Sequence, residues 1–180
     1  MSKFRVESPE VMYAGSTLSI IEQANIEELK KLALLNESQR ARLCTHVDVN
    51  DALHEMLIVH QRGAYVRPHK HVGKSESTHI IEGEVDLVLF DDRGEIERVI
   101  EMGSYESSKP FYYRMNSSVF HMLIVRSDVV IFHETTNGPF VAGASCFADW
   151  APSPNEPANI SKFVATIEIT LNALKMQPPK

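Results

Sequence analysis

Two segments of the chain repeat apolar residues at the spacing of an α-helix. In the first segment, apolar residues three or four positions apart form one helical face; they are Ile26, Leu29, Leu32, Ala33 and Leu35. Asn25 is the expected N-cap. Glu27 and Glu28 then lie where the positive end of the helix dipole favours carboxylates. The pattern predicts a helix that begins directly after Asn25.

The second helical pattern lies near the C-terminus, after a linker-like segment that follows Pro152. Its apolar stripe consists of Ile160, Phe163, Val164, Ile167, Leu171 and Leu174. We expect this stripe to pack on the rest of the chain or on a second subunit. The β-branched run over residues 167–170 leaves a strand as the alternative for that part of the segment.

Between the two helices the pattern changes to short runs with the composition of β-strands. The clearest runs are residues 55–60, 77–81, 84–90, 96–101, 120–126 and 129–134. Turn residues separate them, for example Gly83 and the segment 91–94. Because no helical pattern lies between these runs, a parallel α/β sheet is excluded, and a sandwich or barrel is predicted. The predicted organisation is an N-terminal helical or extended arm over 1–42, a barrel over 43–152, and a linker with a helix over 153–180.

Composition and charge narrow the class of protein. Of the 180 residues, 43% are hydrophobic, and the net charge is −6. A negative surface disfavours nucleic acid and anionic lipid as partners. The N-terminal segment lacks the apolar core of a signal peptide, and the apolar runs are too short to cross a bilayer. The cysteines, Cys44 and Cys146, lie far apart, which fits free thiols in a reducing compartment. The expected location is the cytoplasm.

The segment from Gly63 to Gly83 carries the residues with the clearest chemistry. Side chains alternate along a strand, so His69 and His71 are expected on one face. A bend near Gly73 could return Glu76 to that face, and His121 on a later strand could supply a fourth ligand. A His-x-His pair in a β protein can instead be surface decoration. These four donors predict one divalent transition metal, with iron, manganese, nickel, cobalt and zinc all chemically acceptable.

The same segment resembles the first signature of the cupin superfamily. The spacing is glycine, five residues, His69-x-His71, four residues, Glu76, six residues and Gly83. The second signature of that superfamily is only partly matched: Gly103 and His121 are present. The residues that depart from it are Asn116 in place of proline, Ser118 in place of glycine and Val125 in place of asparagine. The resemblance implies an all-β cupin fold, a double-stranded β-helix or jelly-roll barrel, here with flanking N-terminal and C-terminal helices.

Within that superfamily the chain resembles the WbuC-type cupin metalloproteins over residues 39–152. The matching segments are Arg40-x-Arg42 with His46, Asp51 with Met56, Tyr65-x-Arg67-Pro68-His69-Lys70-His71 with Lys74, Phe90-Asp91-x3-Glu95-Ile96, Glu134 with Gly138-Pro139-Phe140, and Ala148-x-Trp150-Ala151-Pro152. Such proteins are often encoded among polysaccharide-biosynthesis genes. The resemblance implies the fold, the metal site and a carbohydrate context.

Three further residues are candidates for contact with a substrate. Lys74, between the histidines and Glu76, is either a solvated lysine or a contact to a substrate anion and part of the catalytic set. Arg67 should share the inward face with His69, where it either pairs with a carboxylate such as Glu134 or binds an anionic substrate. Glu134 is the candidate acid or base, with an exposed strand-end carboxylate as the alternative.

These features support three hypotheses of different classes. The first is a metal-dependent isomerase, epimerase or lyase that acts on a small, carbohydrate-derived or otherwise anionic substrate. The second is a non-haem iron oxygenase, which uses the same ligands. The third is a non-catalytic module that binds a ligand or a metal. The apolar C-terminal stripe adds the expectation of a homodimer.

Overall fold

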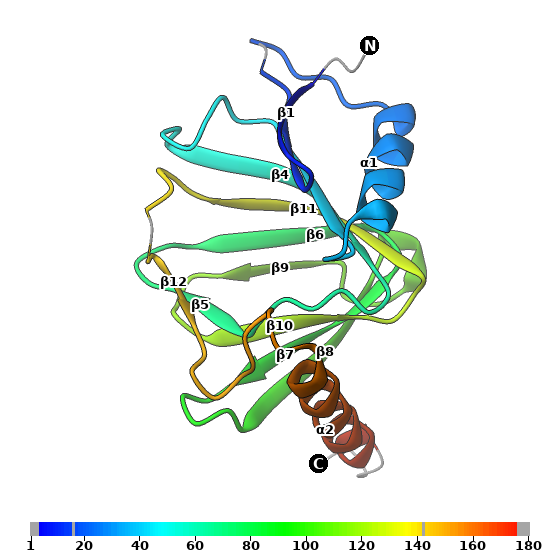
Figure 1. The fold of residues 1–180 in the computed structure, drawn as a ribbon, viewed down its shortest axis with the longest axis vertical. Coiled ribbons are helices and arrows are strands. Elements are labelled where there is room, and N and C mark those ends of the chain that lie inside the picture. Colours follow the sequence, from blue (N-terminus) through cyan, green and yellow to red (C-terminus); the bar gives the residue numbers. More distant parts are fainter. Residues whose placement is uncertain (1–3, 16, 142, 176–180) are drawn as a thin grey trace.

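Two β-sheets face each other in the computed structural model, which describes residues 4–15, 17–141 and 143–175 (Figure 1). The large sheet has, in order, β1 (Arg5–Ser8), β2 (Val11–Tyr13), β3 (Arg40–Cys44), β4 (Leu53–Gln61), β11 (Val129–Asn137), β6 (Glu76–Glu82) and β9 (Tyr112–Met115). The small sheet has β12 (Ser145–Phe147), β5 (His69–His71), β10 (Phe120–Val125), β7 (Glu84–Phe90) and β8 (Ile96–Gly103). Apart from β2 and β3, which are parallel, neighbouring strands are antiparallel. The predicted all-β, jelly-roll architecture with flanking helices is confirmed by this strand order.

The strand runs expected from the sequence correspond to β4, β6, β7, β8, β10 and β11. Apart from β5, whose two histidines were expected on a strand, the shorter strands escaped the sequence pattern, because three to five residues are too few to show alternation. Among these, β1 and β2 lengthen the large sheet beyond β3, and β3 spans residue 42, where the predicted arm ends. A single 3-10 turn, η1 (Tyr105–Ser107), follows β8.

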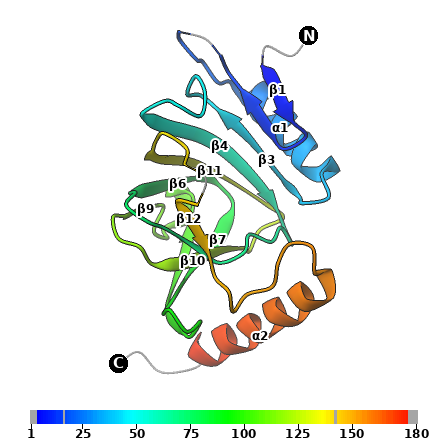
Figure 2. The same ribbon diagram turned by 60° about the vertical axis from the view of Figure 1, so that its left-hand side comes forward.

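Helix α1 (Gln23–Leu35) covers the outer face of the large sheet (Figure 2). Leu29 and Ala33 are buried against Ala41, Leu43 and other residues of the sheet. The predicted N-cap was wrong: Glu22 is the N-cap, and Asn25 is three residues inside the helix. There the Asn25 side-chain oxygen accepts a hydrogen bond of 2.9 Å from the Glu22 backbone N–H. The capping box therefore lets the helix begin before its first apolar residue.

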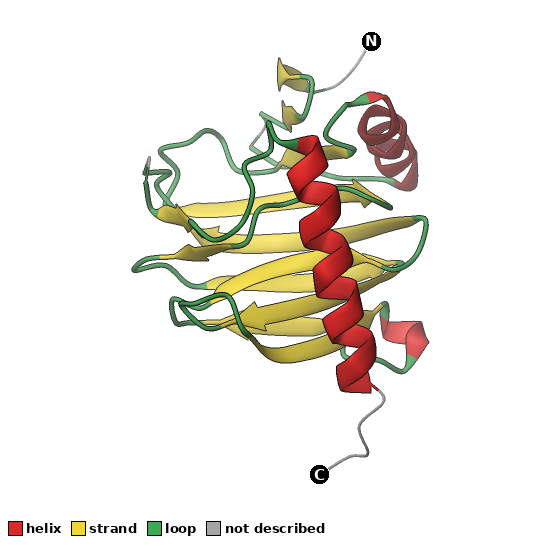
Figure 3. Cartoon of the chain, turned by 60° about the horizontal axis from the view of Figure 1, so that its bottom comes forward, coloured by secondary structure: helices red, strands yellow, loops and turns green. Residues whose placement is uncertain are grey.

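Helix α2 (Pro157–Lys175) lies across the outer face of the small sheet (Figure 3). Ile167 and Leu171 are buried against this sheet, so the helical prediction is confirmed and the strand alternative is wrong. Trp150 joins the same cluster and packs on Phe163 with ring centroids 6.2 Å apart. In the described part of the chain, neither helix combines the length and apolarity that a membrane crossing requires.

The space between the two sheets is filled by side chains that alternate with outward-facing ones. The innermost residues include Ile80, Leu87, Val130 and Phe132, each with an exposed fraction of at most 2%. This apolar core fixes the separation of the sheets. It leaves room beside it for the polar site described next.

Candidate metal centre and its cavity

Three strands from both sheets position the four predicted ligands. His69 and His71 lie at the two ends of β5, on the same face, and His121 lies directly opposite His69 on β10. Glu76 begins β6 in the large sheet. The turn between β5 and β6 contains Gly73 at φ +71°, a left-handed conformation that glycine adopts without strain. That turn carries the chain from one sheet to the other and brings Glu76 back to the histidines.

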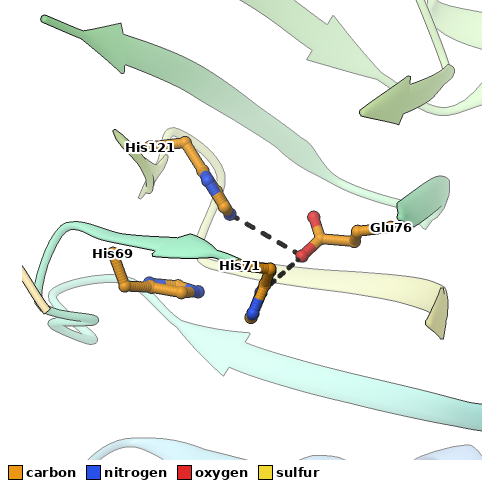
Figure 4. A group of neighbouring side chains, drawn as sticks. All are labelled: His69, His71, Glu76 and His121. Atoms are coloured by element: carbon orange, nitrogen blue, oxygen red, sulfur yellow. Dashed lines mark ion pairs between the residues drawn. The ribbon is translucent and has the colours of Figure 1, made fainter. Parts of the chain in front are cut away.

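The four side chains converge, as Figure 4 shows. One ligand atom from each lies within 4.8 Å of the others. The Glu76 Oε2 atom is 3.0 Å from His71 Nε2 and 3.7 Å from His121 Nε2. Two donors bound to one ion at about 2.1 Å lie about 3.0 to 3.5 Å apart when they are neighbours in the coordination sphere. The cluster could therefore hold a metal ion after shifts of a few tenths of an ångström.

The hydrogen bonds of the three imidazoles fit metal binding. The Nδ1 atom of His69 lies 3.1 Å from the Arg67 carbonyl, and that of His121 lies 3.0 Å from the Val119 carbonyl. A carbonyl only accepts, so both Nδ1 atoms carry the proton in the neutral ring, and both Nε2 lone pairs face the cluster. The Ser145 hydroxyl holds His71 Nδ1 at 3.1 Å. Such bonds orient ligand rings in metal sites.

Glu76 is the charged centre of the cluster, with only 4% of the residue exposed. Burial raises its pKa, but the nearby His121 and His71 imidazoles and the Tyr113 hydroxyl outweigh burial and hold the pKa well below the usual range. The Tyr113 hydroxyl donates to Glu76 Oε1 at 2.6 Å, which leaves Oε2 facing the histidines. The pKa of Tyr113 is raised well above its ordinary value by burial and by Glu76, so this tyrosine remains a donor.

The pKa values of His69 and His121 shift in opposite directions beside the Glu76 carboxylate. Burial, together with the neighbouring imidazoles, lowers the pKa of His69 to about 4. Burial also acts to lower the pKa of His121, but the nearby Glu76 carboxylate raises the pKa overall. Without an ion, His121 therefore takes up a proton before His69 as the pH falls.

The cluster forms one wall of a cavity of about 350 Å³, a volume within the usual range of ligand pockets. Apolar lining comes from Ile58, Leu123, Phe132 and Phe147. Polar lining beyond the four ligands comes from Glu10, Arg40, Arg42, His60, Tyr113, Glu134 and Ser145. The cavity thus joins the cluster to charged side chains of the large sheet.

Glu134 lies on β11 and lines this cavity, as the inward-facing alternative predicted. It pairs with Thr78 on β6, which pairs in turn with Tyr113 on β9. Burial, and next the nearby Glu76 carboxylate, raise the pKa of Glu134 to about 8, although Arg42 lowers it. Near neutral pH this carboxyl group can therefore exist in both protonation states.

The structure does not bring Arg67 and Lys74 to the cavity. Arg67 donates from Nε and Nη2 to the Ala148 carbonyl at 3.0 and 2.6 Å, so it pairs with neither Glu134 nor the cluster. Lys74 Nζ donates to the carbonyls of Asn137 and Pro139, each at 2.7 Å. Both cations tie loops together, because backbone carbonyls satisfy their N–H groups.

Sequence reasoning missed the polar residues of β3. Arg40 and Arg42 alternate with the apolar Ala41 and Leu43, a pattern that predicts two arginines on one strand face. The signal was present, but the segment was assigned to the arm and not to the barrel. Tyr113 had no signal of its own, since nothing local in the sequence pairs it with Glu76.

Comparisons with known proteins give one partial family match and distant structural similarities. Residues 21–102, fewer than half of the chain, match a domain of unknown function (DUF6016). No curated protein matches the sequence. The chain is similar to a sugar phosphate isomerase of the cupin superfamily from Silicibacter pomeroyi, with 18% identity, TM-score 0.39, and coverage of 49% of this chain and 52% of that one.

Two further solved structures are oxalate-handling proteins. An oxalate oxidase in complex with glycolate is 11% identical, with TM-score 0.49 and coverage of 68% of this chain and 62% of that one. An oxalate decarboxylase from Bacillus subtilis with Mn(II) centres is 16% identical, with TM-score 0.44 and coverage of 57% and 26%. The chain spans less than two thirds of each of these three proteins.

Proposed function

We propose that this protein is a metal-dependent enzyme that acts as an isomerase, epimerase or lyase on a small carbohydrate-derived molecule. The observation that carries the proposal is the position of the cluster of His69, His71, Glu76 and His121 on the wall of the cavity, with Glu134 lining the same space. Four protein ligands leave one or two coordination positions open for a substrate. The carbohydrate context comes from the sequence resemblance to the WbuC-type cupins.

In the proposed reaction, the metal ligands and Glu134 have different roles. An ion held by the three histidines and Glu76 would act as a Lewis acid toward a carbonyl or hydroxyl group of the substrate. Glu134 would accept a proton from a carbon next to that group and return it to the neighbouring atom, which completes an isomerisation. Its burial, which raises the pKa of a carboxyl group, suits this exchange, because a proton-transfer group works best when its pKa is near the working pH. Phe132, Phe147 and Leu123 provide apolar lining beside these groups.

The test combines metal analysis with proton exchange. Elemental analysis of untagged protein should give about one divalent transition metal per chain by the ligand count, and His69→Ala and Glu76→Ala should empty the site. Candidate sugars incubated with the protein in D2O should take up deuterium at the reacting carbon, as followed by NMR. Glu134→Gln should keep the metal and lose the exchange.

Each negative result has a distinct meaning. Full metal occupancy in both ligand variants would refute the metal site. Metal without exchange on any carbohydrate would refute the isomerase, epimerase or lyase assignment. Substrate-dependent oxygen uptake by iron-loaded protein, measured with an oxygen electrode, would replace this assignment by that of an oxygenase.

A further inference from the structure

We infer that Arg40 and Arg42 bind the carboxylate or phosphate group of an anionic sugar derivative whose other end reaches the metal cluster. The inference deepens the proposed function and rests on it, since it names the substrate class of the same cavity. The sequence analysis predicted that Arg67 and Lys74 contact the substrate anion. The inference replaces them by Arg40 and Arg42 of β3.

Strand alternation places both arginines on the cavity side of β3. Ala41 and Leu43 are buried beneath α1 on the outer face, with exposed fractions of 2% and 0%. Arg40 and Arg42 therefore face the other way, and both line the cavity. A guanidinium offers several N–H groups in a fixed plane, which matches the oxygens of a carboxylate or a phosphate.

These two guanidinium groups are incompletely matched by carboxylates. Arg40 Nη2 lies 3.5 Å from Glu10 Oε2, a long contact, and Arg40 Nε is buried without a hydrogen-bond partner. Within the described residues, Arg42 has no carboxylate within ion-pair distance. The nearby His60 is buried and adds no compensating negative charge. This end of the cavity therefore has a net positive charge and donors ready for an oxyanion.

The distance to the cluster sets the size of the ligand. Arg42 pairs with Ile58, which lies beside Phe132 on β11, and Phe132 pairs with Ile80 on β6, four residues from Glu76. The path from Arg42 to Glu76 crosses three strand-to-strand spacings and then runs four residues along β6. The backbones of the two residues therefore lie at most about 20 Å apart. The two side chains extend into this distance from both ends. The remaining gap suits a sugar-sized molecule, not a single small anion.

The test uses D-gluconate and D-glucose 6-phosphate as probes, with neutral D-glucose for comparison. Dissociation constants are measured by isothermal titration calorimetry on the full chain, once loaded with metal and once with a chelator. We expect Arg42→Gln to weaken binding of at least one anionic probe by roughly 10- to 100-fold, the usual loss for a hydrogen bond to a charged group. The probe with the larger effect identifies the oxyanion as carboxylate or phosphate.

Three matched variants separate a binding role from a structural one. Arg42→Lys should retain part of the affinity, because it keeps the charge and loses the planar fork. Glu10→Gln should strengthen anion binding by up to about fivefold, since it removes the carboxylate that competes for Arg40. Arg93→Gln removes an exposed arginine of a distant turn and should change nothing.

The outcomes distinguish this inference from the proposed function. If neither anion binds more tightly than glucose, or if Arg42→Gln binds both anions as the wild type does, the inference is refuted whatever the metal content. If the protein holds no metal but Arg42→Gln still weakens anion binding in the chelator experiment, the inference stands and the proposed function fails.

Discussion

His60 makes folding stability depend on pH, and the size of the effect can be worked out. The ring is 7% exposed and packs edge-on against Phe132, with centroids 5.2 Å apart. Burial, then Arg40 and Arg42, lower its pKa from 6.5 to about 3. Arg40 lies opposite His60 in the sheet. The charged groups that shift the pKa of His60 are the two arginines, with no carboxylate among them.

The sign of the effect follows from proton binding. Between pH 6.5 and pH 3 the unfolded chain binds a proton at His60 and the folded protein does not, so stability falls as the pH falls through this window. Each pKa unit corresponds to about 1.4 kcal/mol. At pH 5, about 1.5 units below the unfolded pKa, the loss from His60 is about 2 kcal/mol, and at pH 7 it is about 0.2 kcal/mol.

Urea unfolding, followed by the fluorescence of Trp150, measures this difference. The free energy of unfolding is determined at pH 7 and pH 5 in the presence of a chelator, for the wild type and for His60→Gln. The variant should lose about 2 kcal/mol less than the wild type between the two pH values. His69 and all other titrating groups are present in both proteins, so their contributions cancel.

An exposed residue that does not titrate supplies the control. Leu35→Gln should show the same pH dependence as the wild type, because the substitution removes no titrating group and the side chain is exposed on α1. If His60→Gln and the wild type lose equal free energy between pH 7 and pH 5, His60 is not held neutral in the folded protein, and the reasoning from burial and from the two arginines is wrong.

Four further predictions concern the metal, the core and the assembly. Tyr113→Phe should weaken metal affinity roughly 10- to 100-fold in a competition titration, because Glu76 loses an orienting hydrogen bond; an unchanged affinity would contradict this. Metal affinity should weaken below roughly pH 6, since protons compete for the imidazoles, at His121 before His69, and a flat affinity from pH 8 to pH 5 would argue against histidine ligation. Leu171→Ala should lower the free energy of unfolding by about 2–5 kcal/mol in denaturant titration, because the side chain is 1% exposed. Light scattering should show a homodimer, and a monomer at micromolar concentration would refute that expectation.

Local spacing in the sequence was sufficient to predict the first part of the candidate site. His69, His71 and Glu76 lie within eight residues, so strand alternation and one bend bring them together. The distant His121 was also identified, and the cross-strand pair of His121 and His69 explains its place in the cluster. The departures from the second cupin signature did not displace it.

Side chains whose partners lie far away in sequence were not predictable in the same way. The hydrogen bond from Tyr113 to Glu76 depends on the pairing of β6 with β9, which no local pattern specifies. Arg67 was expected to face the site, but an irregular segment precedes β5, and its guanidinium turns to the Ala148 carbonyl. Alternation holds within a strand and not before it begins.

The ligand set is divided between the two sheets, and this division has a mechanical consequence. Three histidines belong to the small sheet, whereas Glu76 belongs to the large one. An ion bound to all four side chains would link the two sheets across the interior. The distance between the sheets is set by core side chains such as Phe132 and Val125. Tighter packing would favour ions of smaller radius, and looser packing those of larger radius. The metal preference of such a site would therefore depend on the packing of the whole sandwich, and substitutions that do not touch the ion would change it.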